Sequence, residues 1–117
     1  MKRSPEIEAV VRRLWDAGFG RDREALGNHF SQDPNVRAIT LADDEWWLGH
    51  DLVVGLWDVR VTEAGFTRIE FERLEAFEHG SVGWAAAATT AFWPSGNTLS
   101  FRFTLVSVLE AGMWRVV

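Results

Sequence analysis

The pattern of apolar and polar positions changes its period about halfway along the chain. From Ile7 to Trp15 apolar residues recur at intervals of three and four, which is the spacing of one face of an amphipathic helix. Ser4 and Pro5 precede this run, and a capping hydroxyl followed by proline is typical of a helix start. Gly18-Phe19-Gly20 follows it and is expected to end the helix.

Two further helices and two short strands are expected before residue 67. Asp22 is placed to cap a second helix, which carries Leu26 and Phe30 on one side and ends at Asp33-Pro34. His50 or Asp51 opens a third helix. Its inward side is expected to carry Leu52, Val53, Leu56 and Val59. Residues 36–41 and 46–48 are expected to be strands.

The second half of the chain alternates between apolar and polar residues, as strands do. Segments 67–78, 82–93 and 98–109 are separated by His79-Gly80 and by residues 95–97, which are turn sequences. A last strand is expected at residues 113–117. In segment 98–109 one face carries Leu99, Phe101, Phe103 and Leu105. Helices followed by a strand meander predict one α+β domain over residues 1–117, with helices on one face of a curved antiparallel sheet.

Composition limits the chemistry that the chain can perform. Among 117 residues there are seven Trp and eight Phe but no Tyr and no Cys. Tyrosine acids, thiolate nucleophiles, disulfides and cysteine-ligated zinc are therefore excluded. The three His residues show no metal-binding spacing, so neither a metal nor a cofactor is expected.

Charge and hydropathy bear on partners and location. The net charge is −5 and only one Lys is present, which disfavours nucleic-acid binding. No apolar stretch is long enough for a signal peptide or a membrane span, so no membrane partner and a cytoplasmic location are expected.

The segment from Asp43 to His50 is the first candidate site. Asp43, Asp44 and Glu45 should be solvated, whereas the adjacent Trp46 and Trp47 require burial or a ligand. The segment is therefore expected to border a pocket. Because neighbours in a strand point to opposite faces, only one indole can enter it, and Trp47 is the candidate.

Three residues of this segment are candidates for proton transfer: Asp44, Glu45 and His50. The alternatives are a solvated acidic loop and a histidine that caps a helix or lies on the surface. Elsewhere, Trp15, Phe19, Trp57 and Trp84 are expected to line the pocket, with a plain core role as the alternative. Arg102 lies mid-strand among apolar neighbours, so it is expected to pair with Glu45, Glu70 or Glu72, or to bind an acidic ligand.

Several segments, in this order, resemble the superfamily that includes nuclear transport factor two, ketosteroid isomerase and the SnoaL-like polyketide cyclases. They are residues 10–13, 20–22, 30–36, 45–49, 101–104 and 112–116. The resemblance covers nearly the whole chain. It implies a cone in which a strongly bent antiparallel sheet and three helices enclose a deep pocket, commonly dimerised through the sheet.

The resemblance also allows the isomerase catalysts to be tested residue by residue. Aligning the shared motifs places Leu14 at the position of the family's catalytic Tyr. It places Ala38 at the general base, and Leu99 at the protonated Asp. All three are apolar, so ketosteroid isomerase chemistry is not expected, although the three positions should lie in the pocket.

Two functions remain open at this point. The first is binding of a small apolar or aromatic molecule. The second is an isomerase, cyclase or hydrolase whose carboxylate or His lies at the pocket mouth. In either case the protein is expected to be a homodimer. Its interface is expected to be the second apolar face of the strands, including Val106, Val108 and Trp93.

Overall fold

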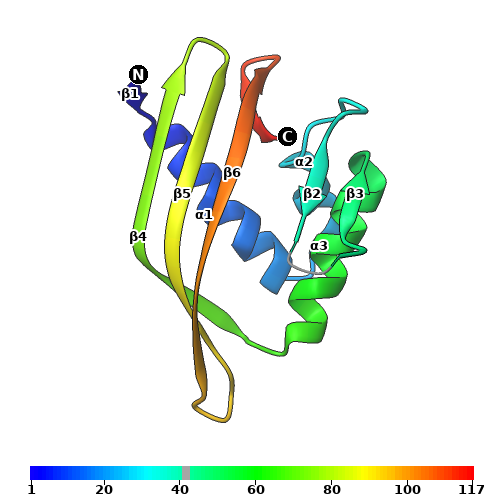
Figure 1. Cartoon of the computed structure of the whole chain (residues 1–117), viewed down its shortest axis with the longest axis vertical. Coiled ribbons are helices and arrows are strands. Elements are labelled where there is room, and N and C mark those ends of the chain that lie inside the picture. The colour runs from blue at the N-terminus through cyan, green and yellow to red at the C-terminus, as the bar shows by residue number, and fades with distance from the viewer. Residues whose placement is uncertain (41–42) are drawn as a thin grey trace.

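The computed structural model describes residues 1–40 and 43–117. Three helices are found in this part of the chain: α1 (Pro5–Phe19), α2 (Arg23–Asn28) and α3 (His50–Ala64). The strands are β1 (Lys2–Arg3), β2 (Arg37–Ile39), β3 (Trp46–Leu48), β4 (Arg68–His79), β5 (Val82–Phe92), β6 (Thr98–Glu110) and β7 (Met113–Val116). A sheet in the order β1-β4-β5-β6-β7 covers α1, and β2–β3 forms a separate hairpin beside α3 (Figure 1).

The helix starts are formed by the residues that the sequence indicated. The Ser4 hydroxyl accepts a hydrogen bond from the Ile7 amide at 3.3 Å, and Asp22 accepts one from the Ala25 amide at 3.1 Å. The second helix ends at Asn28, however, so the predicted extension to Asp33-Pro34 is wrong. Beyond α2 the chain instead pairs with β7, because the Ser31 amide donates to the Val116 carbonyl at 2.8 Å.

The predicted inward face of α3 also needs correction. Leu52 is 54% exposed and Val59 is 47% exposed. Val53 is buried, as expected, Val61 is buried as well although it was not expected on this side, and Trp57 packs against the same core. These three residues are spaced by four, so they form one stripe of the helix, and that stripe lies towards α1.

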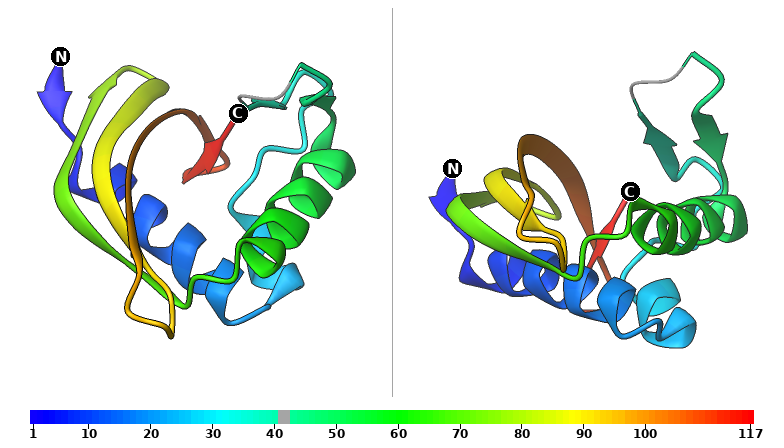
Figure 2. Two further views of the ribbon diagram at one scale, coloured as in Figure 1. Left: turned by 60° about the horizontal axis from the view of Figure 1, so that its bottom comes forward. Right: turned by 90° about the horizontal axis from the view of Figure 1, so that it is seen from below.

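The sheet is antiparallel throughout and strongly bent, as expected from the sequence. β5 and β6 pair without any shift of register from Val82↔Val108 to Phe92↔Thr98. The β4–β5 pairing shifts between Phe71 and Arg73, and such a bulge increases the local bend and twist. Figure 2 shows the sheet curving over α1. The periodicity did not predict this bulge, nor the two-residue strand β1.

Alternation gives the sheet an inner face and an outer face. On the inner face β5 presents Gly83, Ala85 and Ala87, and these small residues let α1 approach closely. On the outer face Trp84 is 36% exposed and Val106 is 50% exposed.

Trp93 does not join the outer face, contrary to expectation. It follows the end of β5, and its indole N–H donates to the Ala64 carbonyl at 2.8 Å, which anchors the end of α3. Within the described residues, no helix is long and apolar enough to cross a membrane.

Candidate functional site

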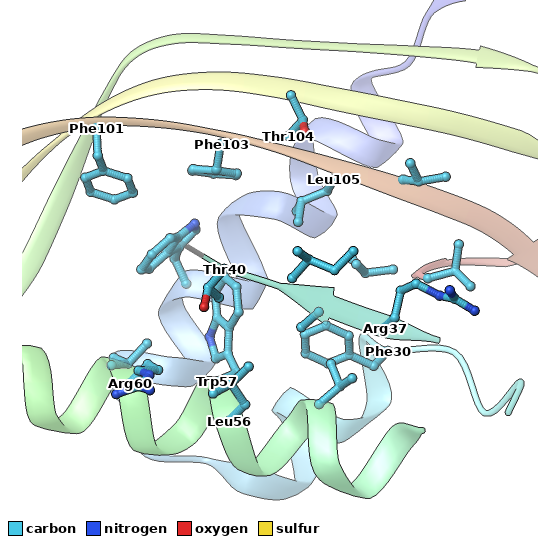
Figure 3. Close-up of a pocket in the computed structure, with 18 of the residues that line it drawn as sticks. Phe30, Arg37, Thr40, Leu56, Trp57, Arg60, Phe101, Phe103, Thr104 and Leu105 are labelled. Carbon is cyan, nitrogen blue, oxygen red and sulfur yellow. The ribbon is translucent and has the colours of Figure 1, made fainter. Parts of the chain in front are cut away.

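A cavity of about 640 Å³ lies between the inner face of the sheet, α1, α3 and the β2 strand (Figure 3). Its aromatic lining comes from five different parts of the chain. These residues are Trp15, Phe30, Trp57, Phe66, Phe101 and Phe103. Phe101 and Phe103 project from β6 into the same space that Trp57 enters from α3.

The rings form one connected cluster in the wall of the cavity. Trp15 and Trp57 meet edge to face with ring centroids 4.8 Å apart, and Trp15 lies 5.7 Å from Phe103. The indole N–H groups of Trp15 and Trp57 are buried and find no acceptor among the described residues. The cluster therefore offers ring faces and edges, with little hydrogen bonding.

Four residues give the lining its polar groups: Arg37, Thr40, Arg60 and Thr104. Arg60 is already engaged, because it donates to Glu45 and lies 3.5 Å from Glu63. Thr40 also donates its hydroxyl hydrogen to Glu45, which is only 9% exposed. This ion pair fixes the end of the hairpin to α3 and closes one side of the cavity.

The three proton-transfer candidates lie apart from the cavity lining. Asp44 is exposed in the turn before β3, and Glu45 is held by Arg60 and Thr40. The Nε2 atom of His50 lies 2.8 Å from the Gly27 carbonyl oxygen, so the imidazole links α3 to α2. The structure does not bring a carboxylate and His50 to a shared point in the cavity.

Three of the nine predicted pocket residues line the cavity: Trp15, Ala38 and Trp57. The placement of six others has to be corrected. Leu14 is fully buried in the core because it lies on the side of α1 that faces the helices and the sheet together. Phe19 contributes to a second hollow, between α1 and β4, and Leu99 is exposed near the far end of the sheet.

Trp47 packs against the core and does not reach the cavity, whereas Trp46 is 59% exposed. The expected separation of the two indoles is therefore found, but Trp47 lies beneath the hairpin, against the core.

Trp84 and Arg102 lie on the outer face of the sheet, away from the cavity. They occupy the strand positions that alternate with the inward-facing Ala85 and Phe103. Arg102 is exposed and forms no ion pair with any residue that the structure describes, so the expected partner among Glu45, Glu70 and Glu72 is not found.

Sequence reasoning missed several lining residues. The alternation in segment 98–109 already separated Phe101 and Phe103 from Arg102, and this signal could have placed both rings in the cavity. Phe30 was expected on the apolar side of the second helix, but nothing in that pattern connected it with the cavity. Phe66 lies outside the periodic segments, so no local pattern indicated it. Arg60 was missed because one charged residue in a helix is normally solvated.

Among the described residues, potential metal ligands and histidines with a shifted pKa do not gather at the cavity. No cluster of three or more potential metal ligands occurs within the described ranges 1–40 and 43–117. The pKa of His29 is lowered from its ordinary value of 6.5, first by burial and second by the nearby positive charge of Arg13. His29 lies beyond the end of α2 and outside the cavity lining.

Comparisons with known proteins agree on the fold. A family model described as a SnoaL-like domain matches residues 7–117. An NTF2-like protein of unknown function from Pseudomonas putida KT2440 has a TM-score of 0.80 at 16% identity, covering 96% of this chain and 80% of that one. No curated protein matches the chain.

Two similar structures carry a proposed activity. One is a proposed ketosteroid isomerase from Shewanella frigidimarina, with a TM-score of 0.75, 12% identity, and coverage of 92% of this chain and 87% of that one. The other is a proposed dehydratase of the NTF2-like family from Streptomyces avermitilis, with a TM-score of 0.69, 12% identity, and coverage of 95% and 89%. At these identities the likeness concerns the fold alone.

Proposed function

This chain is a member of the SnoaL-like domain family, and from that premise we propose that its cavity binds a small apolar or aromatic molecule without chemical conversion. The observation that carries the proposal is the cluster of six aromatic rings around a space of about 640 Å³. Cavities of that size and apolar character are typical of small-molecule sites.

The titratable groups at the cavity favour binding over catalysis. Among the described lining residues they are Arg37 and Arg60, and neither guanidinium is a proton-transfer group at neutral pH. The enzymatic alternative would require Glu45 to leave Arg60 and Thr40 and turn inward. Separating a nearly buried carboxylate from its partners is unfavourable, so we place this alternative second.

Titration with a fluorescent hydrophobic dye tests the proposal, and Trp57→Ala is the informative variant. We expect it to weaken one-to-one dye binding by about 1–3 kcal/mol, because a large ring in the cavity wall is lost. Trp46→Ala is the matched control, since this equally large ring lies on the exposed side of the hairpin.

The control should change the dye affinity less than about twofold, the size expected for a surface substitution. If wild type, Trp57→Ala and Trp46→Ala bind the dye with equal affinity and their circular dichroism spectra are unchanged, the dye does not bind in the cavity and the proposal is wrong. Acceptance of a substrate and release of a changed product would instead support the enzymatic alternative.

We also propose that the protein forms a homodimer through the outer face of the sheet. The support is the apolar surface formed by Trp84, Val82 and Val106 beside the small Ala86 and Ala88. Exposed apolar patches on one face of a sheet usually mark an interface, and a two-fold axis lets one such patch cover its copy.

Light scattering at micromolar concentration should give about twice the 13.3 kDa of one chain. Trp84→Glu should give a monomer, because a two-fold interface would bury the new carboxylate twice. Leu52→Glu is the control, since Leu52 is exposed on α3 and away from this face. A monomeric wild type, or a dimeric Trp84→Glu variant, would contradict the proposal.

A further inference from the structure

The second hollow, with a volume of about 540 Å³, lies between the second half of α1 and the beginning of β4. Its size is within the range of small-molecule sites. α1 contributes one stripe of residues spaced by three and four, and β4 contributes four consecutive residues. They are Arg12, Trp15, Asp16 and Phe19 from α1, and Arg68, Ile69, Glu70 and Phe71 from β4. Of these, Trp15 alone also lines the cavity described above, so the two sites are distinct.

Aromatic rings form the apolar part of this hollow. Trp15 and Phe19 lie with ring centroids 5.9 Å apart, and Phe19 is only partly buried. Ile69 and Phe71 pack against the core from the side of β4 and are also partly buried. A ligand in the hollow therefore meets ring surface that the fold leaves accessible.

Two charged side chains of α1 border these rings without a partner of their own. Arg12 and Asp16 are exposed and four residues apart, a spacing at which opposite charges on a helix commonly pair. Here the Arg12 guanidinium instead lies over the Phe71 ring, 4.9 Å from its centroid. Within the described ranges 1–40 and 43–117, neither side chain forms an ion pair or a hydrogen bond.

The other two charges at the hollow are already engaged. Nη1 of Arg68 lies 2.7 Å from Oε1 of Glu70, and the same guanidinium lies 3.7 Å from the centroid of the Phe92 ring. The hollow therefore offers one available cation, Arg12, and one available anion, Asp16. Stacking on Phe71 orients the Arg12 guanidinium while its N–H groups remain at the edge, where a carboxylate accepts them in pairs.

We propose that the second hollow binds a small zwitterion with an aromatic side chain, the chemical class of the free aromatic amino acids. The carboxylate of the ligand accepts hydrogen bonds from Arg12, its ammonium group donates to Asp16, and its ring lies against Trp15 and Phe19. The Cβ atoms of Arg12 and Asp16 are separated by one helical turn, about 5–6 Å, so both charged groups of one amino acid can reach them. A ligand with a single charge would be attracted by one of the two side chains and repelled by the other.

Calorimetric titration with three related probes tests the proposal. L-Phenylalanine carries both charges, phenylpropanoate lacks the ammonium group, and phenylethylamine lacks the carboxylate. We expect L-phenylalanine to bind one-to-one, and each of the other two probes to bind about tenfold more weakly because one charge-assisted contact is lost.

Two variants locate the binding site. In Arg12→Gln, L-phenylalanine should bind no better than phenylethylamine, and in Asp16→Asn it should bind no better than phenylpropanoate, because each variant removes the partner of one charge. Both residues are exposed, so the two variants are expected to fold. Arg13→Gln is the matched control, since Arg13 is an exposed neighbour on α1 that does not line the hollow, and it should keep both preferences.

No binding of L-phenylalanine, equal binding of the three probes, or tighter binding of either single-charge probe overturns the proposal. So do unchanged preferences in Arg12→Gln and Asp16→Asn. Protein whose cavity is saturated with the hydrophobic dye should still bind L-phenylalanine, and loss of that binding would place the probe in the cavity and also overturn the proposal. Dye binding in the absence of L-phenylalanine is a separate measurement, so it fails or succeeds independently of this site.

Discussion

Replacing Leu14 by Ala is expected to lower the free energy of unfolding by about 2–5 kcal/mol, the range for removing a fully buried leucine side chain. Leu14 has no exposed surface and packs in the main core cluster. The residues around it belong to α1, α3 and the sheet, so they cannot all move inward to refill the space. Urea unfolding followed by tryptophan fluorescence measures the effect.

Leu52→Ala is the matched control for this prediction, because the same atoms are removed from a leucine that is exposed on α3. It should change the free energy of unfolding by no more than about 0.5 kcal/mol. The comparison also distinguishes a closely packed core position for Leu14 from a position in the wall of the cavity. A residue in the wall of an open cavity loses fewer packing contacts when it is truncated. Similar values for the two variants would mean that Leu14 is not part of a closed core.

The fold was predictable from sequence wherever one element repeats a single pattern. The strands β4, β5 and β6 lie within about one residue of the predicted segments. Apolar and polar residues alternate along each strand with a two-residue period, and turn sequences mark where one strand ends and the next begins. The inward face of α3 was not predictable in the same way. This helix has apolar residues on several sides, so Leu52 and Val59 were expected to face inward together with Val53, whereas the buried Val61 was not.

The site was less predictable than the fold because it depends on contacts between distant segments. Of the nine residues expected at a pocket, Trp15, Ala38 and Trp57 line the cavity. Glu45 is the last of three consecutive acids and was a candidate for proton transfer, yet its environment is set by Arg60, fifteen residues away. No local pattern reports such a partner, since i,i+3 and i,i+4 neighbours are the pairs that a helix sequence reveals.

Gly83→Ala is expected to be as severe as a core truncation, for the opposite reason. A Cβ at this position would lie 2.6 Å from the Phe77 carbonyl oxygen and directly against Cδ1 of Ile7. The carbonyl belongs to the β4–β5 ladder and Ile7 is fixed at the start of α1, so neither can yield cheaply. Overpacking of this kind lowers the free energy of unfolding by about 3 kcal/mol.

Gly55→Ala is the control for this prediction and should act with the opposite sign. Gly55 lies inside α3, and the nearest atom to an added Cβ is an Arg23 nitrogen at 3.6 Å, which is an ordinary contact. The change should raise the free energy of unfolding by about 0.5–1 kcal/mol, because alanine favours the helix over glycine. A Gly83→Ala variant as stable as wild type would mean that α1 does not lie directly on β5. The cavity would then be wider beside α1 than described, because the position of Trp15 depends on the contact between α1 and β5.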